Sequence, residues 1–321
     1  MAVDPGGFRR AGAGAEIASV LILMLAILVP FLTKSVLADS MIKQALIGIN
    51  AAFSVYIMLR MNLLSFATPA FMALGGYAVA ILSMRGVTDV FLLTALAFTI
   101  PALVAWPLGA LVLRLRGTYF VLVTFVLTEI LQLLLFETPG LTGGSNGIAG
   151  IPAATFFGTE IGTNQDVFVL IAVLTLLAGL ITAAITRLFR QHFGAIEENE
   201  ILAETLGLSL WTYKSAGFVV AAGVAGLAGF SLVTMLLTAH PTSFSSSTSV
   251  DTIAYTIIGG RGSMLGPVVG SALLVSASNL LGSQGQYAQG LYGLLIITVV
   301  MVAKGGITGS IAALVRRLGA R

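Results

Sequence analysis

The sequence has no cysteine and very few charged residues. Only 9% of its 321 residues are Asp, Glu, Lys or Arg, whereas soluble domains carry about 25%. A soluble fold that is 57% hydrophobic would expose large apolar patches, so the composition indicates an integral membrane protein. The absence of cysteine excludes a disulfide framework and leaves the redox compartment unspecified.

Motifs for common catalytic and cofactor chemistry are also missing. The sequence contains neither GxxxxGK[ST], which binds ATP phosphates, nor HExxH, which binds zinc. Its two histidines, His192 and His240, lie at the edges of apolar runs. An intramembrane serine protease needs a buried Ser/His pair, and Ser145 with His240 falls in polar loops. We therefore expect no catalytic residue, no metal, no cofactor bound by this chain and no nucleic acid partner.

Apolar runs of about 20 residues dominate the chain, and the mean hydropathy is +1.02. Such runs are typical of transmembrane helices, not of the alternating strands of a barrel. The predicted fold is an all-α, polytopic transmembrane helical bundle. We expect a break or kink in the third run, at Pro69 or at Gly75 and Gly76. The runs are 17–32, 44–59, 63–84, 90–113, 118–136, 166–186, 215–238, 252–258, 267–281 and 288–303.

The N-terminal end has two interpretations. Arg9 and Arg10 followed by an apolar run are typical of a signal peptide, and residues 36–38 (Val-Leu-Ala) resemble a cleavage site. We favour a retained first helix, because a polytopic chain needs no separate export signal. The predicted organisation is a cytoplasmic segment 1–16, a transmembrane domain 17–303 and a basic cytoplasmic tail 304–321.

Basic residues indicate the orientation, because cytoplasmic loops are enriched in Lys and Arg. With the N-terminus inside, twelve basic residues fall on the cytoplasmic side and only Lys34, Lys43 and Arg85 fall outside, while Arg261 is unassigned. This assignment places residues 137–165 and 239–251 outside the cell. The cytoplasmic set is Arg9, Arg10, Arg60, Arg114, Arg116, Arg187, Arg190, Lys214, Lys304, Arg316, Arg317 and Arg321.

The segment 252–281 determines the span count. Residues 252–258 are too few to cross a bilayer, which needs about 20 residues, and the sequence GGRGSMLG follows them. We expect a re-entrant pair or a broken span there, which requires surrounding protein or a water-filled path. The count is eight spans, or ten if the pair crosses.

A polar island, residues 187–214, separates two of the longest apolar runs. It holds Glu197, Glu198, Glu200 and Glu204. On a single helix, three of these glutamates share one arc and the apolar residues face the opposite arc. Gly207 follows where a helix-terminating glycine is expected. The island is either a solvated loop helix or a docking element for a soluble partner.

Few polar groups lie inside the apolar runs. Glu129 is the one acidic residue clearly within a run, either as a functional group or as a hydrogen-bonded contact between helices. Small residues there also serve close helix packing. The substrate-pathway candidates are Asn50, Thr68, Gly75, Gly76, Glu129, Gly259 and Gly260; Ser54 and Asn279 are further polar interior positions.

Residues 141–152, LTGGSNGIAGIP, form a glycine-rich loop on the predicted outer side. Successive glycines form either an anion-binding nest or a rigid turn available to a partner. The candidate contacts for a partner are Gly143, Gly144, Ser145 and Asn146.

Several stretches together resemble one family. These are residues 114–130 with 141–152, residues 193–230, and residues 257–274, which reads IIGGRGSMLGPVVGSALL. In these stretches and their order, the chain resembles permease subunits of bacterial branched-chain amino acid ABC transporters, a subfamily that includes urea and amide importers.

The resemblance implies that residues 187–214 are a cytoplasmic loop that couples the permease to a separate ATPase. It implies a second permease subunit, two ATP-binding subunits that hold the ATP, a periplasmic or extracellular solute-binding protein, and the bacterial plasma (inner) membrane with both termini cytoplasmic. The implied coupling residues are Glu197, Glu198, Glu200, Leu202, Ala203, Glu204, Leu206 and Gly207.

Two other functions remain as alternatives. An ion-coupled secondary transporter needs no ATPase but requires an ion site near the membrane midplane, for which Glu129 is the only acidic candidate. A purely structural membrane scaffold is disfavoured by the predicted broken helices. The sequence leaves the solute open among amino acids, amides, urea and small carboxylates.

Overall fold

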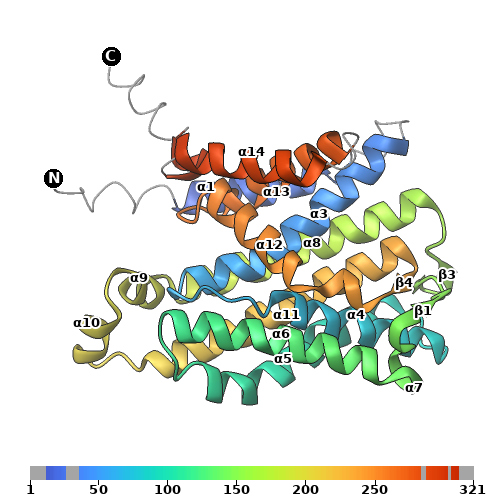
Figure 1. The fold of residues 1–321 in the computed structure, drawn as a ribbon, viewed down its shortest axis with the longest axis horizontal. Coiled ribbons are helices and arrows are strands. Elements are labelled where there is room, and N and C mark those ends of the chain that lie inside the picture. The colour runs from blue at the N-terminus through green and yellow to red at the C-terminus, as the bar shows by residue number, and fades with distance from the viewer. Residues whose placement is uncertain (1–11, 27–35, 283–286, 303–304, 311–321) are drawn as a thin grey trace.

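The computed structural model describes residues 12–26, 36–282, 287–302 and 305–310, and these are almost entirely helical (Figure 1). The helices and strands are α1 (Gly12–Ala26), α3 (Val36–Leu59), α4 (Thr68–Met84), α5 (Val90–Val112), α6 (Thr118–Glu137), α7 (Pro139–Thr142), η1 (Gly144–Asn146), β1 (Ile148–Ala149), β2 (Thr155–Phe156), β3 (Thr159–Glu160), α8 (Asn164–Leu188), α9 (Arg190–Glu198), α10 (Glu200–Thr205), α11 (Leu210–Leu236), β4 (Thr238–Ala239), η2 (Pro241–Phe244), α12 (Ser246–Gly259), α13 (Leu265–Gly282) and α14 (Ala288–Val302).

Six helices in the described residues, α3, α5, α6, α8, α11 and α13, are long and apolar enough to cross a membrane. The helix α4 and residues 290–299 of α14 are shorter apolar helices. The prediction of an all-α polytopic bundle is therefore confirmed. The predicted N-terminal segment 1–16 and tail 304–321 lie mostly outside the described residues.

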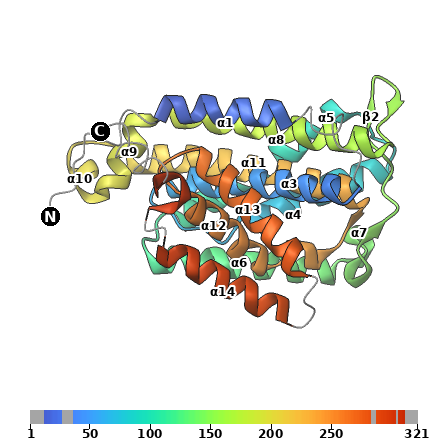
Figure 2. The same cartoon turned by 90° about the horizontal axis from the view of Figure 1, so that it is seen from above.

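The long helices run between two distinct ends of the molecule (Figure 1). One end carries α9 and α10, and we refer to it as the α9–α10 end. The other carries α7 and the short strands, where β2 pairs antiparallel with β3. We refer to it as the hairpin end. Viewed from above, α1 lies along α8 at one edge and α14 lies at the opposite edge (Figure 2).

The central helix is α11, which contacts α3, α4, α5 and α8. Its glycines permit this packing. A Cβ on Gly226 would lie 2.0 Å from the Ala97 carbonyl oxygen of α5, and one on Gly229 would lie 1.9 Å from the Met72 carbonyl oxygen of α4. Only residues without a side chain allow helix backbones to approach so closely in a membrane.

The predicted break in the third run is wrong at Gly75 and Gly76, because α4 is continuous through both. A Cβ on Gly75 would lie 2.5 Å from the backbone of Gly226, so these glycines serve the contact with α11. Pro69 lies in the first turn of α4, where a missing N–H costs no helical hydrogen bond. The helix therefore starts at Thr68, and the preceding residues of the apolar run are non-helical.

The prediction that residues 239–251 form a loop is wrong for its second half. Helix α12 already begins at Ser246, and several of its hydroxyl groups donate to backbone carbonyls, that of Ser249 to Phe66 outside the helix. The Thr252 hydroxyl donates to the Thr248 carbonyl, and the Thr256 hydroxyl to the Thr252 carbonyl. Hydroxyls bonded in this way expose no unsatisfied donor inside an apolar environment.

The predicted break between α12 and α13 is confirmed. Helix α12 ends at Gly259, and Gly260 has φ +117°, a conformation that favours glycine. The 14 residues of α12 extend only about 21 Å at 1.5 Å each. They are too short for a bilayer core of about 30 Å, and α12 packs along α13.

The two glycine- and serine-rich loops meet at the hairpin end. Strand β1 pairs with β4, which aligns Ile148 with Ala239. The His240 ring nitrogen Nε2 lies 2.9 Å from the backbone oxygen of Ser145. His240 therefore contacts the main chain of Ser145, and its second ring nitrogen contacts the Thr242 hydroxyl. These contacts join the two loops. They do not form a catalytic Ser/His pair, because His240 contacts the backbone oxygen of Ser145 and not its hydroxyl.

We expect Gly229→Ala to destabilise the protein, because the new methyl group would overlap the Met72 carbonyl of α4. Overpacking of this kind costs about 1–3 kcal/mol. The matched control is Gly293→Ala, because a Cβ on that α14 glycine has no neighbour within 4 Å in the described residues. Thermal unfolding of the purified protein in detergent measures both. Equal melting temperatures for the two variants would contradict the close contact.

Candidate functional site

The polar island between α8 and α11 forms two short helices. The prediction of one amphipathic helix is wrong, because Asn199 adopts an extended conformation between α9 and α10. The Asn199 side chain accepts a hydrogen bond from the Leu202 N–H at 3.0 Å and so caps the start of α10. Asparagine is a preferred residue at this position. We call residues 187–214 the α9–α10 loop.

The break separates Glu197 on α9 from Glu200 and Glu204 on α10, so the three do not form the predicted shared arc. Glu197 pairs with Arg60, which directly follows α3. Glu200 lies 2.6 Å from the amine of Lys214 near the start of α11. Glu204 lies 2.9 Å from the guanidinium of Arg116 in the connection between α5 and α6. Arg116 also lies 3.6 Å from Glu200, so it bridges the two carboxylates of α10.

An apolar anchor reinforces these ion pairs. Phe193 on α9 is fully buried and lies beside Gly217 of α11, where a Cβ would be 3.3 Å from the Phe193 ring. Ile196, Ala203 and Leu210 form a small buried cluster between α9, α10 and α11. Burying such side chains contributes about 25 cal/mol per Å² of apolar surface. The loop therefore sits on the bundle as a packed element.

Large apolar side chains are exposed on and directly after α10. Ile201, Leu202 and Leu206 are 66%, 56% and 79% exposed. Large aliphatic side chains grouped at the tip of a polar loop indicate a surface that another protein covers. Glu198 is also exposed at the end of α9, beside this group.

Gly207 ends α10 as predicted. Its φ is +89°, its N–H donates to the Glu204 carbonyl, and the Leu208 N–H donates to the Ala203 carbonyl. This pair of hydrogen bonds is the Schellman arrangement, which requires a left-handed residue and therefore favours glycine.

The glycine-rich turn at the hairpin end is rigid. Gly143 and Gly144 both have positive φ, and a Cβ on Gly143 would lie 2.0 Å from the Gly147 carbonyl oxygen. The Asn146 N–H donates to Gly143 and the Gly147 N–H to Gly144. Because these amides are already paired within the turn, the rigid-turn interpretation is favoured over an anion-binding nest. Ser145 and Asn146 are exposed.

The predicted pathway residues do not converge on one site. Asn50 and Thr68 are fully buried, and their side-chain polar atoms have no hydrogen-bond partner in the described residues. Gly75 and Gly76 pack against α11, and Gly259 packs against Gly266. Gly260 lies at the break between α12 and α13.

Glu129 lies on the exposed side of α6. The buried positions of this helix are Phe120, Thr124, Thr128 and Leu135. At 100° per residue, Glu129 points away from them and toward the arc of its exposed leucines and valines. In the described residues its carboxylate has no hydrogen bond or ion pair. A carboxylate among lipid chains is costly, so this face of α6 indicates a contact with protein or water.

An open cavity of about 250 Å³ lies between α3, α11, α12 and α13. Its lining includes the carboxylate of Asp251, a residue that was predicted to lie in an outer loop. Helical spacing places Thr248, Asp251, Thr252 and Tyr255 on one side of α12. This spacing in the sequence could have indicated a helix with a polar face. The lining residues are Gln44, Ile47, Gly48, Ala51, Met72, Leu232, Ser243, Thr248, Asp251, Thr252, Tyr255, Val275, Ser278 and Asn279.

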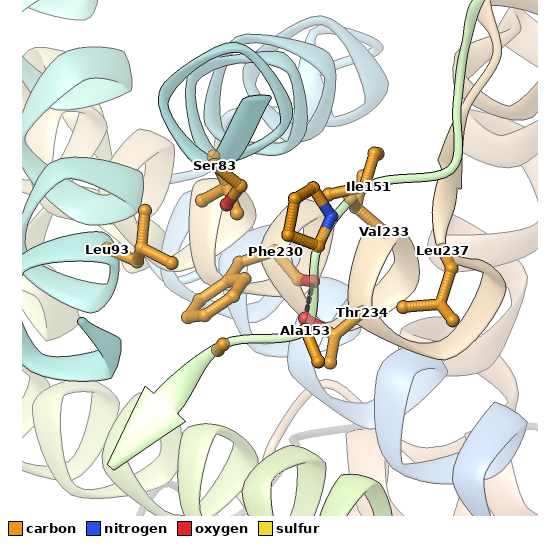
Figure 3. Close-up of a pocket in the computed structure, with 11 residues that line it drawn as sticks. Ser83, Leu93, Ile151, Ala153, Phe230, Val233, Thr234 and Leu237 are labelled. Carbon is orange, nitrogen blue, oxygen red and sulfur yellow. Dashed lines mark hydrogen bonds between the residues drawn. The ribbon is translucent and has the colours of Figure 1, made fainter. Parts of the chain in front are cut away.

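A second gap lies at the hairpin end, between α4, α5, α11 and residues 151–154 (Figure 3). Ser83, Ile151 and Phe230 are among the side chains around it, and the Thr234 hydroxyl donates to the Phe230 carbonyl. Its volume is only about 10 Å³, which holds one water at most. This gap is a packing feature and not a solute site.

Comparisons with known proteins agree on one family. The model of the family described as "Branched-chain amino acid transport system / permease component" matches residues 36–303. The chain is similar to two proteins named "High-affinity branched-chain amino acid transport system permease protein LivM". Identity is 31% over 255 residues to that of Salmonella typhimurium and 29% over 307 residues to that of Escherichia coli.

These alignments cover 72% and 85% of the chain, respectively. They span only 60% of the Salmonella protein and 72% of the Escherichia coli protein. No solved structure matches the chain.

We expect Gly207→Ala to loosen the end of α10, because a left-handed residue with a Cβ costs about 1–2 kcal/mol. The matched control is Gly194→Ala in α9, which has open space around it and a helical backbone that favours alanine. Hydrogen–deuterium exchange of residues 199–208 measures the effect. Faster exchange in the Gly207 variant alone supports the arrangement; identical protection in both variants contradicts it.

Proposed function

The chain belongs to the family of branched-chain amino acid transport permeases, and from this membership we propose that it is the membrane subunit of an ATP-driven importer. The proposed solute is a branched-chain amino acid or a related small polar molecule. ATP hydrolysis takes place on separate subunits, so the chain itself is a conduit and not an enzyme. It holds no ATP and needs no other cofactor.

The α9–α10 loop carries this proposal. A coupling element must contact an ATPase on one side and be attached firmly to the membrane helices on the other. Its attachment is supported by the pairs that Glu197, Glu200 and Glu204 form with bases of the bundle. The contact with the ATPase is supported by the exposed Leu202 and Leu206. Apolar side chains at the centre of a patch with charges around it are typical of protein interfaces.

This attachment explains how movement of the ATPase subunits is transmitted to the helices around the solute path. ATP binding moves the ATPase subunits together, and the α9–α10 loop transmits that movement because it is packed and ion-paired to α3, α11 and the α5–α6 connection. The helices then tilt as a unit, and the path opens to the other side of the membrane. The energy for this change comes from ATP.

A second permease subunit completes the path in this proposal. Helix α6 supports it, because only 17% of its apolar window is buried in this chain. A face that also carries Glu129 is poorly suited to lipid. A second permease packed there covers the apolar side chains and provides a polar partner for the carboxylate.

The proposed orientation places the α9–α10 end and both termini in the cytoplasm of a bacterium. The hairpin end then faces outward, where a periplasmic or extracellular solute-binding protein docks. The rigid turn with exposed Ser145 and Asn146 provides a contact for it. The excess of basic residues on the cytoplasmic side supports this orientation.

We expect Leu202→Asp combined with Leu206→Asp to abolish binding of the ATPase subunits. Two charges in the centre of an apolar contact add an unpaired desolvation cost, while both positions are exposed, so the fold is unaffected. The measurement is co-purification of ATP-binding subunits with the tagged chain from native membranes. The control is Leu141→Asp, which is equally exposed but lies at the hairpin end.

Loss of the ATPase from the Leu202/Leu206 variant alone is the expected outcome. An ATPase that co-purifies equally with all variants would remove the α9–α10 loop from the interface. If no ATPase accompanies the unmodified chain, the importer assignment fails, and ion-coupled transport becomes the better explanation.

A further inference from the structure

We propose that the cavity between α3, α11, α12 and α13 binds the ammonium group of a small aliphatic solute, with Asp251 as its counter-ion. This inference rests on the proposed import function and specifies the chemistry of the solute. Four features of the cavity support it: a carboxylate without a basic partner among the described residues, neutral polar groups, aliphatic lining residues and a suitable size.

The Asp251 carboxylate is only weakly satisfied by the protein. It accepts a hydrogen bond from the Tyr292 hydroxyl of α14 at 3.5 Å, the outer limit for such a bond. A carboxylate has about four acceptor positions. In the described residues no Lys, Arg or His forms a salt bridge with Asp251.

The basic residue of α3 next to the cavity, Lys43, already has partners of its own. Lys43 is buried, and its amine lies 2.9 Å from Asp39 one turn away. It also donates to the Asn164 side chain of α8. Gln44, the next residue, lines the cavity, but its amide is neutral. A carboxylate at membrane depth that lacks a fixed cation favours a cation from the solute.

Neutral hydrogen-bonding groups lie around the carboxylate. The Asn279 amide of α13 donates to the Gln44 amide at 2.9 Å, which fixes both side chains at the cavity. Ser278 and Tyr255 add hydroxyl groups to the lining. Such groups are suited to the remaining N–H donors of an ammonium and to the polar end of an amino acid.

Much of the remaining lining is aliphatic, and it specifies the rest of the solute. Ile47, Ala51, Met72, Leu232 and Val275 contribute hydrocarbon surface. A bare metal ion gains nothing from such a lining, whereas a branched side chain buries its methyl groups there. A hard cation would also need several oxygen ligands at fixed distances. The described residues contain no group of three His, Cys, Asp or Glu side chains that could hold a metal.

The volume and place of the cavity suit a small solute that arrives from the hairpin end. Binding pockets for drug-sized ligands are about 300–1,000 Å³, and this cavity is about 250 Å³. Asp251 lies in the second turn of α12, directly after η2 and the β4 strand of the hairpin end. In the proposed orientation, the cavity therefore lies in the outer half of the membrane.

The test uses the absence of cysteine from the chain. Ser278→Cys places one thiol at the cavity, in the complete importer reconstituted in proteoliposomes. The labelling rates of two small thiosulfonates are compared, one cationic (aminoethyl) and one anionic (sulfonatoethyl). Because Asp251 attracts a cation and repels an anion, we expect the cationic reagent to be favoured on the order of tenfold or more.

Three variants in the Ser278→Cys background isolate the carboxylate. Asp251→Asn should abolish the preference for the cationic reagent, and Asp251→Glu should retain it. Asp89→Asn is the matched control, because this carboxylate caps α5 outside the cavity and asparagine also caps helices. It should retain the preference as well. Equal labelling by both reagents with Asp251 in place would overturn the proposal.

L-leucine, 4-methylpentanoate and sodium are then tested as protecting agents. We expect protection by leucine and none by 4-methylpentanoate, which has the same aliphatic chain but no ammonium group. Protection by sodium alone, or equal protection by both organic compounds, would overturn the assignment. If the unmodified importer transports no branched-chain amino acid, the solute assigned under the proposed function is wrong. The charge preference of the Ser278→Cys thiol still tests the cation site in that case.

Discussion

Three carboxylates hold the α9–α10 loop to the membrane helices through bases from three parts of the bundle, and Glu200 and Glu204 share one of these bases, Arg116. Arg60 follows α3, Arg116 lies between α5 and α6, and Lys214 belongs to α11. Single exposed ion pairs contribute little, about 0–1 kcal/mol each. Here Lys214 and the Glu200 side chain are largely buried, and the fully buried Phe193 packs beside Gly217 of α11. Together these contacts make the loop a continuation of the bundle.

The bundle itself contains a tight part and a looser part. Where α11 meets α4 and α5, glycines bring the backbones together, and the overlap that a single methyl would cause at Gly226 or Gly229 leaves no room for a solute. Where α3 faces α12 and α13, the structure instead leaves a cavity with a carboxylate in its wall. In the proposed importer, the rigid core would transmit movement and the cavity beside it would hold the solute.

Much of the fold follows from the sequence, because span length and hydropathy alone determine the apolar helices. The break at Gly260 and the end of α10 at Gly207 were also predictable, since both depend on local glycine conformations. The interruption at Asn199 was not, because a regular period through residues 197–204 conceals one extended residue. The pairing of Glu197 with Arg60 joins residues 137 positions apart, which no local pattern reveals. Asp251 was assigned to a loop because serines and threonines precede it, although α12 already begins at Ser246 and the Ser249 hydroxyl donates to the Phe66 carbonyl.

In the proposed importer, the α9–α10 loop moves with the bundle as one body. The absence of cysteine allows a direct distance measurement between spin labels at Ala195→Cys on α9 and Leu103→Cys on α5, both exposed positions. Pulsed electron paramagnetic resonance on the complete importer compares the nucleotide-free and ATP-bound states. If the loop and the bundle move together, the distance distribution is the same in both states. A shift of more than about 5 Å, roughly one helical turn, would contradict it, because the loop would then move independently of the helices to which its glutamates are paired.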